Sequence, residues 1–248
     1  MIDTHAHLDA CSEPAEVLVQ RAKQNGVTRI VAIGSGIDSC RAALHAAAAN
    51  DGVWAALGIH PHQAADGDAG RVGELRELLG APRAVAVGET GLDFYRQRAP
   101  RERQVALFRA QLELAADLHK PVVVHSRDAD DETAAELADF AGGVVLHCFS
   151  SPGLLPAALE RGYYVSFAGN VTYRRADELR AAAAEVPPER LLAETDSPYL
   201  APQPVRGRPN EPANVRHTFA ALAELRGVPV EELAAQVDEN ADACFSLS

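Results

Sequence analysis

The chain has 248 residues, of which 47% are hydrophobic and 23% are charged, and its formal net charge is −12. This composition is typical of a globular enzyme, and no apolar run approaches the roughly 18 residues that a membrane helix requires. The acidic balance argues against a protein that coats duplex nucleic acid with basic surface, although a few arginines could still form a local phosphate site. The 4 cysteines form no C-x-x-C pair and no secretory signal is apparent, so we expect a cytoplasmic protein, and we expect it to be a monomer.

Eight short apolar segments, each suited to a buried β-strand, follow one another along the chain. They are Met1–Leu8, Arg29–Gly34, Val53–His60, Ala84–Glu89, Pro121–His125, Val144–His147, Tyr163–Phe167 and Leu191–Asp196. Helical patterns lie between most of them, as at Glu16–Asn25, Arg41–Asn50 and Arg101–Leu118. Alternation of this kind predicts a parallel sheet closed into a (β/α)8, or TIM, barrel that forms a single domain over residues 1–248. An open, doubly wound sheet is the alternative.

Two further helices are expected after the last strand. Pro212 suits the first turn of one helix, which Gly227 ends, and the other runs over Pro229–Phe245. Both are interpreted as structural. The segments Asp66–Gly70 and Pro202–Pro212 are predicted to be surface loops.

Polar residues stand at the carboxyl ends of the predicted strands, which is where barrels build their active sites. They are His5, His7, Glu89, His125, His147 and Asp196. His5 and His7 are two residues apart on an extended segment, so their side chains point to the same side and can bind one metal ion. Six such residues exceed the needs of one closed site, but they fit two divalent metal ions that share a carboxylate. Mg, Mn and Zn all suit these residue types.

Glu89 is the residue expected to bridge the two ions. Related barrels that hydrolyse amides would use a modified lysine at the end of strand four or five. Lys120 lies before strand five and Lys23 lies on the first helix, so neither can serve. A bridging glutamate favours phosphoester hydrolysis.

Two more carboxylates, those of Asp3 and Glu194, are expected to point into the barrel just below the ions, because they share the parity of the strand-end residues. They could orient the imidazoles that bind the ions. Alternatively, each could pair with a buried basic group.

Seven motifs, spread in order along the chain, resemble the TatD family of metal-dependent deoxyribonucleases. They are Ile2–Asp9, Gly58–His62, Gly88–Tyr95, Pro121–Asp128, His147–Ser150, Glu194–Pro202 and Arg208–Asn214. The resemblance implies a TIM-barrel hydrolase with one or two divalent metal ions that cuts DNA or RNA, typically as an exonuclease. It also implies how the ions are held: His5, His7, Glu89 and Asp196 at one, and Glu89, His125 and His147 at the other. Acidic stretches at 128–132 and 240–245 speak against broad contact with a polynucleotide.

The expected reaction is hydrolysis of a phosphodiester at single-stranded DNA or RNA ends, or in a small phosphoester, by a metal-activated water. Asp196 is the best candidate to take the water's proton, with Glu89 as the bridge, although these roles could be exchanged. His60 could donate to a phosphoryl oxygen or to the leaving group, unless it only shapes a turn with His62. One alternative is hydrolysis of a small-molecule ester or amide, and another is a metal-binding protein without catalysis.

Arginines gather in the segments that follow strand ends, where a net-acidic enzyme would need them to grip phosphate. Arg127 and Arg208 are the preferred phosphate contacts, and His62 is expected to contact the substrate as well. Tyr95 lies in the same region and could stack on a base.

Overall fold

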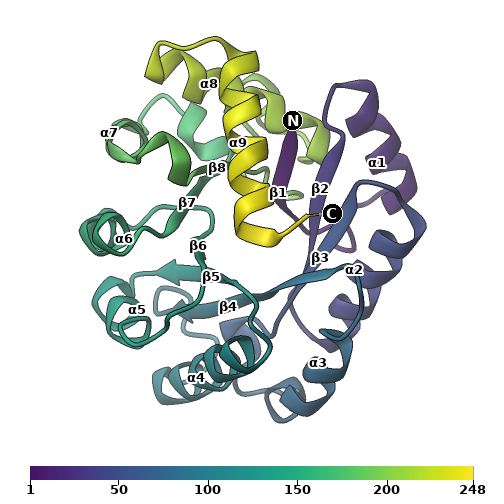
Figure 1. Ribbon diagram of the computed structural model, residues 1–248, viewed down its shortest axis with the longest axis vertical. Coiled ribbons are helices and arrows are strands. Elements are labelled where there is room, and N and C mark those ends of the chain that lie inside the picture. Colours follow the sequence, from purple (N-terminus) through teal and green to yellow (C-terminus); the bar gives the residue numbers. More distant parts are fainter. Residues whose placement is uncertain (248) are drawn as a thin grey trace.

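Eight parallel strands lie in sequence order in one sheet of the computed structural model, which describes residues 1–247 (Figure 1). They are β1 Ile2–Ala6, β2 Arg29–Gly34, β3 Val53–Leu57, β4 Ala84–Asp93, β5 Val122–Arg127, β6 Val144–Leu146, β7 Tyr164–Phe167 and β8 Leu191–Ala193. The ring closes where β1 meets the segment after β8, through a parallel bridge between Ala6 and Ser197. The predicted TIM barrel is therefore confirmed over the open sheet.

The strands begin near their predicted positions, but several end elsewhere. β1, β3, β6 and β8 stop before the last polar residue that the sequence predicts for each, so His7, His60, His147 and Asp196 lie in the segments just after them. At Asp196 the backbone has a positive φ of 54°, which turns the chain out of the strand direction. β4 differs the other way, because it continues four residues beyond Glu89 to Asp93. Its pairing with β5 shifts in register between Val87 and Thr90.

Helices surround the sheet. They are α1 Ala15–Gln24, α2 Ile37–Ala49, α3 Val72–Leu78, α4 Arg101–Asp117, α5 Asp130–Glu136, α6 Leu155–Arg161, α7 Asp177–Glu185, α8 Val215–Arg226 and α9 Val230–Phe245. The acidic run that starts near Asp128 supplies the first turn of α5, where carboxylates favour the positive helix end. Pro212 lies in a short 3-10 turn that precedes α8, one correction to the predicted helix start, while Gly227 ends that helix with φ 67° as expected.

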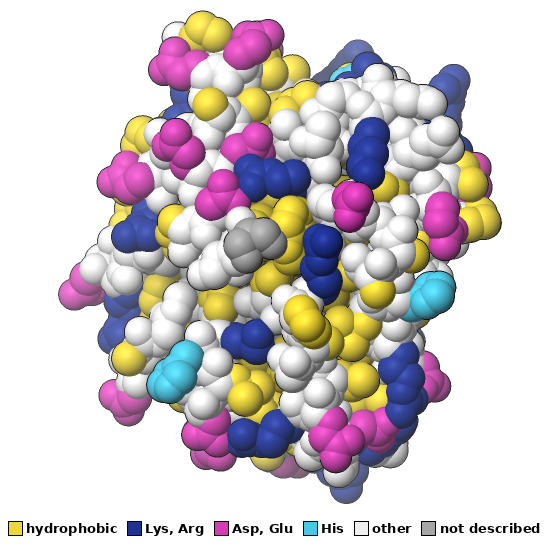
Figure 2. All heavy atoms as spheres, turned by 45° about the vertical axis from the view of Figure 1, so that its right-hand side comes forward, with side chains coloured by type: hydrophobic (Ala, Val, Ile, Leu, Met, Phe, Trp, Pro, Cys, Tyr) yellow, Lys and Arg dark blue, Asp and Glu magenta, His cyan; other side chains and the backbone are white. Residues whose placement is uncertain are grey.

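The amino end of the barrel is covered by α9, which crosses in front of the strands in Figure 1 and packs on β1 and β8. Asn240 on α9 is buried and donates two hydrogen bonds, to Pro188 O at 2.7 Å and to Leu191 O at 2.8 Å. On this side of the molecule, acidic, basic and apolar side chains are interspersed (Figure 2). Within residues 1–247, no helix is both long and apolar enough to cross a membrane. The opposite end of the barrel is where the predicted functional residues lie.

Candidate active site

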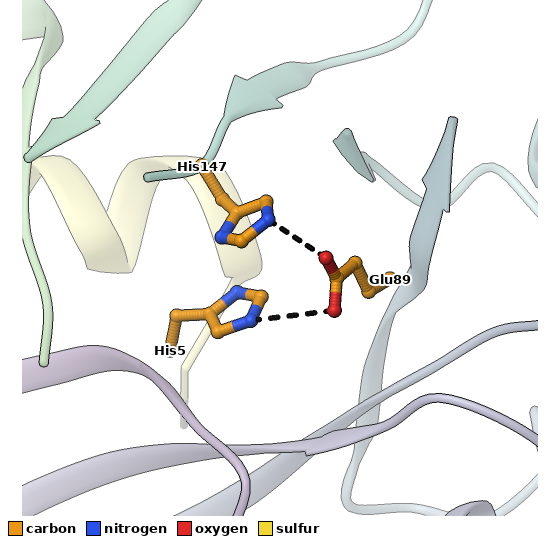
Figure 3. A group of neighbouring side chains, drawn as sticks. All are labelled: His5, Glu89 and His147. Carbon is orange, nitrogen blue, oxygen red and sulfur yellow. Dashed lines mark ion pairs between the residues drawn. The ribbon is translucent and has the colours of Figure 1, made fainter. Parts of the chain in front are cut away.

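Glu89, on β4, lies at the centre of a cluster of histidines at the carboxyl ends of the strands. Its buried carboxylate points between the imidazoles of His5, from β1, and His147, which directly follows β6 (Figure 3). Glu89 Oε1 lies 2.8 Å from His147 Nε2, and Oε2 lies 3.8 Å from His5 Nε2. The two imidazole rings are stacked, with their centroids 3.9 Å apart. Three residues that are far apart in the sequence thus meet around one carboxylate.

Oε2 of Glu89 faces a first group of possible metal ligands. His7 Nε2 lies 3.4 Å from it, and Asp196 Oδ1 lies 3.6 Å from His7 Nε2 and 3.9 Å from His5 Nε2. The two imidazole nitrogens are themselves 3.2 Å apart. The barrel closure places this group, because the Asp196 amide donates to His5 O at 2.9 Å. The atoms of His5, His7 and Asp196 are close enough together to bind one ion.

Oε1 of Glu89 faces a second group. His147 Nε2 lies 2.8 Å from this oxygen, His125 Nδ1 lies 3.0 Å from it and His60 Nε2 lies 3.3 Å from it. These residues follow β6, lie on β5 and follow β3, respectively. The two oxygens of Glu89 therefore each face their own set of imidazole nitrogens.

Two outer carboxylates lie behind imidazoles of the second group. Glu194 Oε1 accepts hydrogen bonds from His147 Nδ1 at 3.2 Å and from the Cys148 amide at 2.8 Å. Asp93 Oδ2 lies 3.5 Å from His125 Nε2 and accepts from His62 Nε2 at 2.7 Å. Glu194 thus engages the outer nitrogen of His147 and leaves Nε2 of that ring to face Glu89.

The inner nitrogens of His125 and His147 both point at the same oxygen of Glu89. Burial disfavours the charged rings, but the nearby carboxylates raise the pKa of His147 well above its usual value and that of His125 as well, so without an ion a proton lies where a cation could bind. The nitrogens are also only 3.3 Å apart, as two ligands of one ion would be. The residues present therefore fit divalent metal ions.

His60 differs from the other histidines of the cluster. Its Nδ1 accepts a hydrogen bond from the His62 amide at 3.1 Å, which caps the turn over Pro61–Gln63. A neutral ring then carries its proton on Nε2 and donates it to Glu89 Oε1. Burial lowers the pKa of His60 to about 4, so the ring is neutral. His60 thus both shapes a turn and holds the central carboxylate.

Burial and mutual charge set the protonation of the cluster. Burial, together with the neighbouring His147, holds the pKa of His5 well below its usual range. Burial disfavours the charged form of His7 too, but hydrogen bonds to Asp196 and Glu89 raise its pKa to about 10. Burial alone would raise the pKa of Glu89, yet the surrounding imidazoles bring it well below its usual value. Glu89 is therefore ionised and acts as the negative centre of the cluster.

Asp3 plays neither of the two roles that the sequence predicts for it. Its carboxyl group accepts from the Thr195 amide at 2.8 Å and from the Thr195 hydroxyl at 2.6 Å, so it orients no imidazole and pairs with no basic side chain among the described residues. Burial raises its pKa to about 8. Asp3 instead ties β1 to the segment that leads to Asp196.

A cleft of about 590 Å³ opens over the cluster. Arg127 and His62 line it, whereas Arg208 is exposed on the loop before Asn210 and Tyr95 is 58% exposed beside it. The Arg127 guanidinium lies over the Tyr95 ring, 4.5 Å from its centroid. The structure thus brings Arg127 and His62 to the site and leaves Arg208 outside the lining of the cleft.

Asp93 is the residue at this site that the sequence did not single out. An acidic residue at the end of an apolar strand is the signal that could identify it, but the sequence predicts that this strand ends at Glu89, four residues earlier. Gln104 of α4 fixes it by donating to Asp93 O and accepting from the Asp93 amide. Burial would raise the pKa of Asp93, but hydrogen bonds from His125, the Arg96 amide and His62 bring it below its usual range.

The sequence model of the family described as "TatD related DNase" matches residues 2–246. The chain belongs to this TatD family. Among its relatives, the "Uncharacterized metal-dependent hydrolase TatD" of Mycobacterium tuberculosis is 40% identical over 262 residues, covering 100% of this chain and 98% of the relative. The "3'-5' ssDNA/RNA exonuclease TatD" of Erwinia billingiae is 40% identical over 240 residues, covering 93% of this chain and 92% of the relative.

A TatD-family crystal structure has the same barrel. The Escherichia coli TatD homologue YjjV superposes with a TM-score of 0.92 at 33% identity, covering 100% of this chain and 98% of that one. The residues around Glu89 are consistent with this family, because a metal-dependent hydrolase needs clustered nitrogen and carboxylate ligands in a cleft. This TatD protein is a metal-dependent hydrolase.

Proposed function

We propose that this protein removes nucleotides from the ends of single-stranded DNA or RNA, with two divalent metal ions bound around Glu89. The observation that carries the proposal is the position of this carboxylate, with each oxygen facing a separate set of imidazole nitrogens. The name of the Erwinia relative, a 3'-5' exonuclease of single-stranded DNA and RNA, supports the choice of substrate.

The ligands of the two ions follow from the two groups. His5, His7 and Asp196 with Glu89 Oε2 would hold one ion, and His125 and His147 with Glu89 Oε1 would hold the other. When bound, such ions supply a hydroxide nucleophile near neutral pH and offset the charge that develops on a phosphoryl group.

Asp196 is the residue that we assign to proton transfer. Its side chain is 12% exposed, against 4% for Glu89, so water in the cleft can reach it. Glu89 is enclosed by imidazoles and by the donor of His60, which suits a bridging ligand better than a base. Asp196 would take the proton of the attacking water.

His62 and Arg127 are assigned to the substrate. Asp93 accepts from His62 Nε2, which fixes the ring in the wall of the cleft and leaves Nδ1 as an acceptor for a donor group of the substrate. Arg127 is braced by the Tyr95 ring, and its planar guanidinium can grip a phosphate with two hydrogen bonds. His60, whose donor is engaged by Glu89, serves to position that carboxylate.

The test uses protein loaded with Mg²⁺, Mn²⁺ or Zn²⁺ and 5'-labelled single-stranded 12-nucleotide DNA and RNA. The wild type should release nucleotides stepwise, whereas Glu89→Gln and Asp196→Asn should not. Glu239→Gln, the same chemical change on exposed α9, is the matched control and should match the wild type. Equal release by all four proteins would reveal a contaminating nuclease, and cleavage of a p-nitrophenyl carboxylic ester without any cleavage of oligonucleotide would refute the proposal.

A further inference from the structure

A second cleft, of about 700 Å³, adjoins the cleft over the metal-ligand cluster. The two share three wall residues, Arg127, Cys148 and Leu200. The rest of the second wall comes from segments that follow β5, β6, β7 and β8, which are neighbours in the sheet (Figure 1). A polymeric substrate bound at Glu89 could therefore continue past Arg127 directly from the first cleft into the second.

Four arginines line this second cleft: Arg127, Arg174, Arg175 and Arg206. None of them has an ion-pair partner among residues 1–247, whereas Arg21, Arg71 and Arg109 elsewhere are each paired with carboxylates. Asp128 is the one acidic residue in the lining. In a protein of net charge −12, four unpaired arginines around one cleft create a local positive potential against a repulsive background. The arginine cleft, as we call it, suits a polyanion.

Two of these guanidinium groups are held in place by aromatic rings. Arg206 lies over the ring of Tyr173, 4.1 Å from its centroid, and the Tyr173 hydroxyl donates to Ala201 O at 3.1 Å. Arg127 lies over Tyr95 in the same way. Stacking uses the face of a guanidinium and leaves its N–H groups at the edge, where they can donate to phosphate oxygens.

A polar acceptor lies in the same wall. Asn170 Oδ1 is buried and has no hydrogen-bond partner among the described residues. Single-stranded nucleic acid combines evenly spaced phosphates with bases and sugars that carry donors. Its phosphates would use the arginines, and its donors would use this acceptor.

We propose that the arginine cleft binds the phosphates next to the scissile one, so that the enzyme acts on oligonucleotides more efficiently than on dinucleotides. This inference rests on the proposed function and adds a second binding site, with Arg174, Arg175 and Arg206 as its residues. The net charge of −12 disfavours contact outside this path, which limits the number of phosphates bound to a few.

The test compares kcat/KM for a 12-nucleotide single-stranded DNA with kcat/KM for the dinucleotide dTpT, in metal-loaded enzyme. The variant is Arg174→Gln/Arg175→Gln, and Arg206→Gln provides an independent check. The control is Arg103→Gln/Arg216→Gln, which removes the same charge from two exposed arginines that line neither cleft. All of these positions are exposed, so the variants should fold.

In the Arg174/Arg175 variant, we expect the ratio of the two kcat/KM values to fall about tenfold or more, since each charged hydrogen bond lost weakens binding of the longer substrate only. The log–log dependence of kcat/KM on NaCl should become shallower by about 1.4, at roughly 0.7 per phosphate contact on a single strand. The control should change neither. A ratio within twofold of the control would overturn the inference while the proposed function stands, and failure of the wild type on both substrates would overturn both.

Discussion

The two ends of the barrel differ in how their buried polar groups are satisfied. At the amino end, Asn240 has both of its donors engaged, and the Lys120 ammonium donates to Ala84 O at 2.6 Å. At the carboxyl end, buried imidazoles gather around the Glu89 carboxylate, and His5 Nδ1 and Glu194 Oε2 have no hydrogen-bond partner among the described residues. At the amino end these two side chains are satisfied within the fold, whereas the carboxyl end is arranged for a cation.

This difference separates stability from chemistry along the barrel axis. Buried polar groups that are fully hydrogen-bonded stabilise the fold, and removing one partner leaves the other unsatisfied. Buried polar groups that lack a partner cost stability until an ion binds among them. The free energy of ion binding then stabilises the folded state. Substitutions at the amino end should therefore lower stability with little effect on activity. Substitutions at the carboxyl end should lower metal affinity and activity with little loss of stability.

The strongest test of this difference between the two ends compares Glu89→Gln with Glu239→Gln. We expect Glu89→Gln to lower kcat/KM on oligonucleotide by at least about 10³-fold, because it removes the one charge that both groups of imidazoles share. Far-UV circular dichroism should show that the metal-free variant keeps its fold. Retention of more than a tenth of the activity would show that the carboxyl end does not depend on this carboxylate.

Asp93→Asn tests the outer carboxylates. The amide can still accept from the Arg96 backbone but no longer carries the charge that faces His125 and holds His62. We expect metal affinity, measured by calorimetry, to fall about 10- to 100-fold, with little change in thermal stability of the metal-free protein. Asp66→Asn, in the exposed loop after His62, is the matched control. An unchanged affinity would remove Asp93 from the ion-binding machinery.

Metal binding should release protons, and this direction follows from the raised pKa of His7. Without an ion, Asp196 and Glu89 raise this pKa to about 10 against the effect of burial, so His7 is protonated at pH 7 and an ion must displace that proton. Lower pH therefore favours the metal-free form, and affinity should fall about tenfold per pH unit for each proton displaced. Calorimetry in Tris and in PIPES measures the protons directly, and identical apparent enthalpies in both buffers would contradict the expectation.

Asn240→Ala tests the amino end and should have the smallest effect on activity. The change leaves two buried carbonyl groups unsatisfied, so we expect a loss of about 1–3 kcal/mol of unfolding free energy. The melting temperature should drop by roughly 2–10 °C, while kcat/KM measured well below that temperature stays at the wild-type value. Glu239→Ala, one residue away and exposed, should leave both quantities unchanged. A large loss of activity in the Asn240 variant would mean that the two ends are coupled.

The barrel and most of its cluster could be predicted because a parallel strand buried on both faces is a continuous apolar run, and a polar residue at its end is conspicuous. The short helices α3, α5, α6 and α7 were harder to foresee, since seven to nine residues give little periodicity. Asp93 was missed because a register shift inside β4 is invisible in sequence.

The substrate-facing residues show a different limit. Arg206 and Arg208 stand two residues apart in one loop, yet Arg206 lines the arginine cleft and Arg208 does not. The sequence shows that the loop follows β8, but the side to which each guanidinium turns depends on neighbours such as Tyr173, which belongs to another loop. Tertiary contact decides such roles, and a single sequence does not record it.

The bridge between Ala6 and Ser197 has a consequence for synthesis of the protein. The first two histidines leave the ribosome early, but the aspartate that completes their group follows only after nearly 190 more residues, which takes about 10–40 s at typical elongation rates. Throughout that interval the opening strand has an unsatisfied edge and no partner for its imidazoles. A nascent chain that captured a metal ion with these two side chains would do so before the ring existed, and the last strand would then have to close around it.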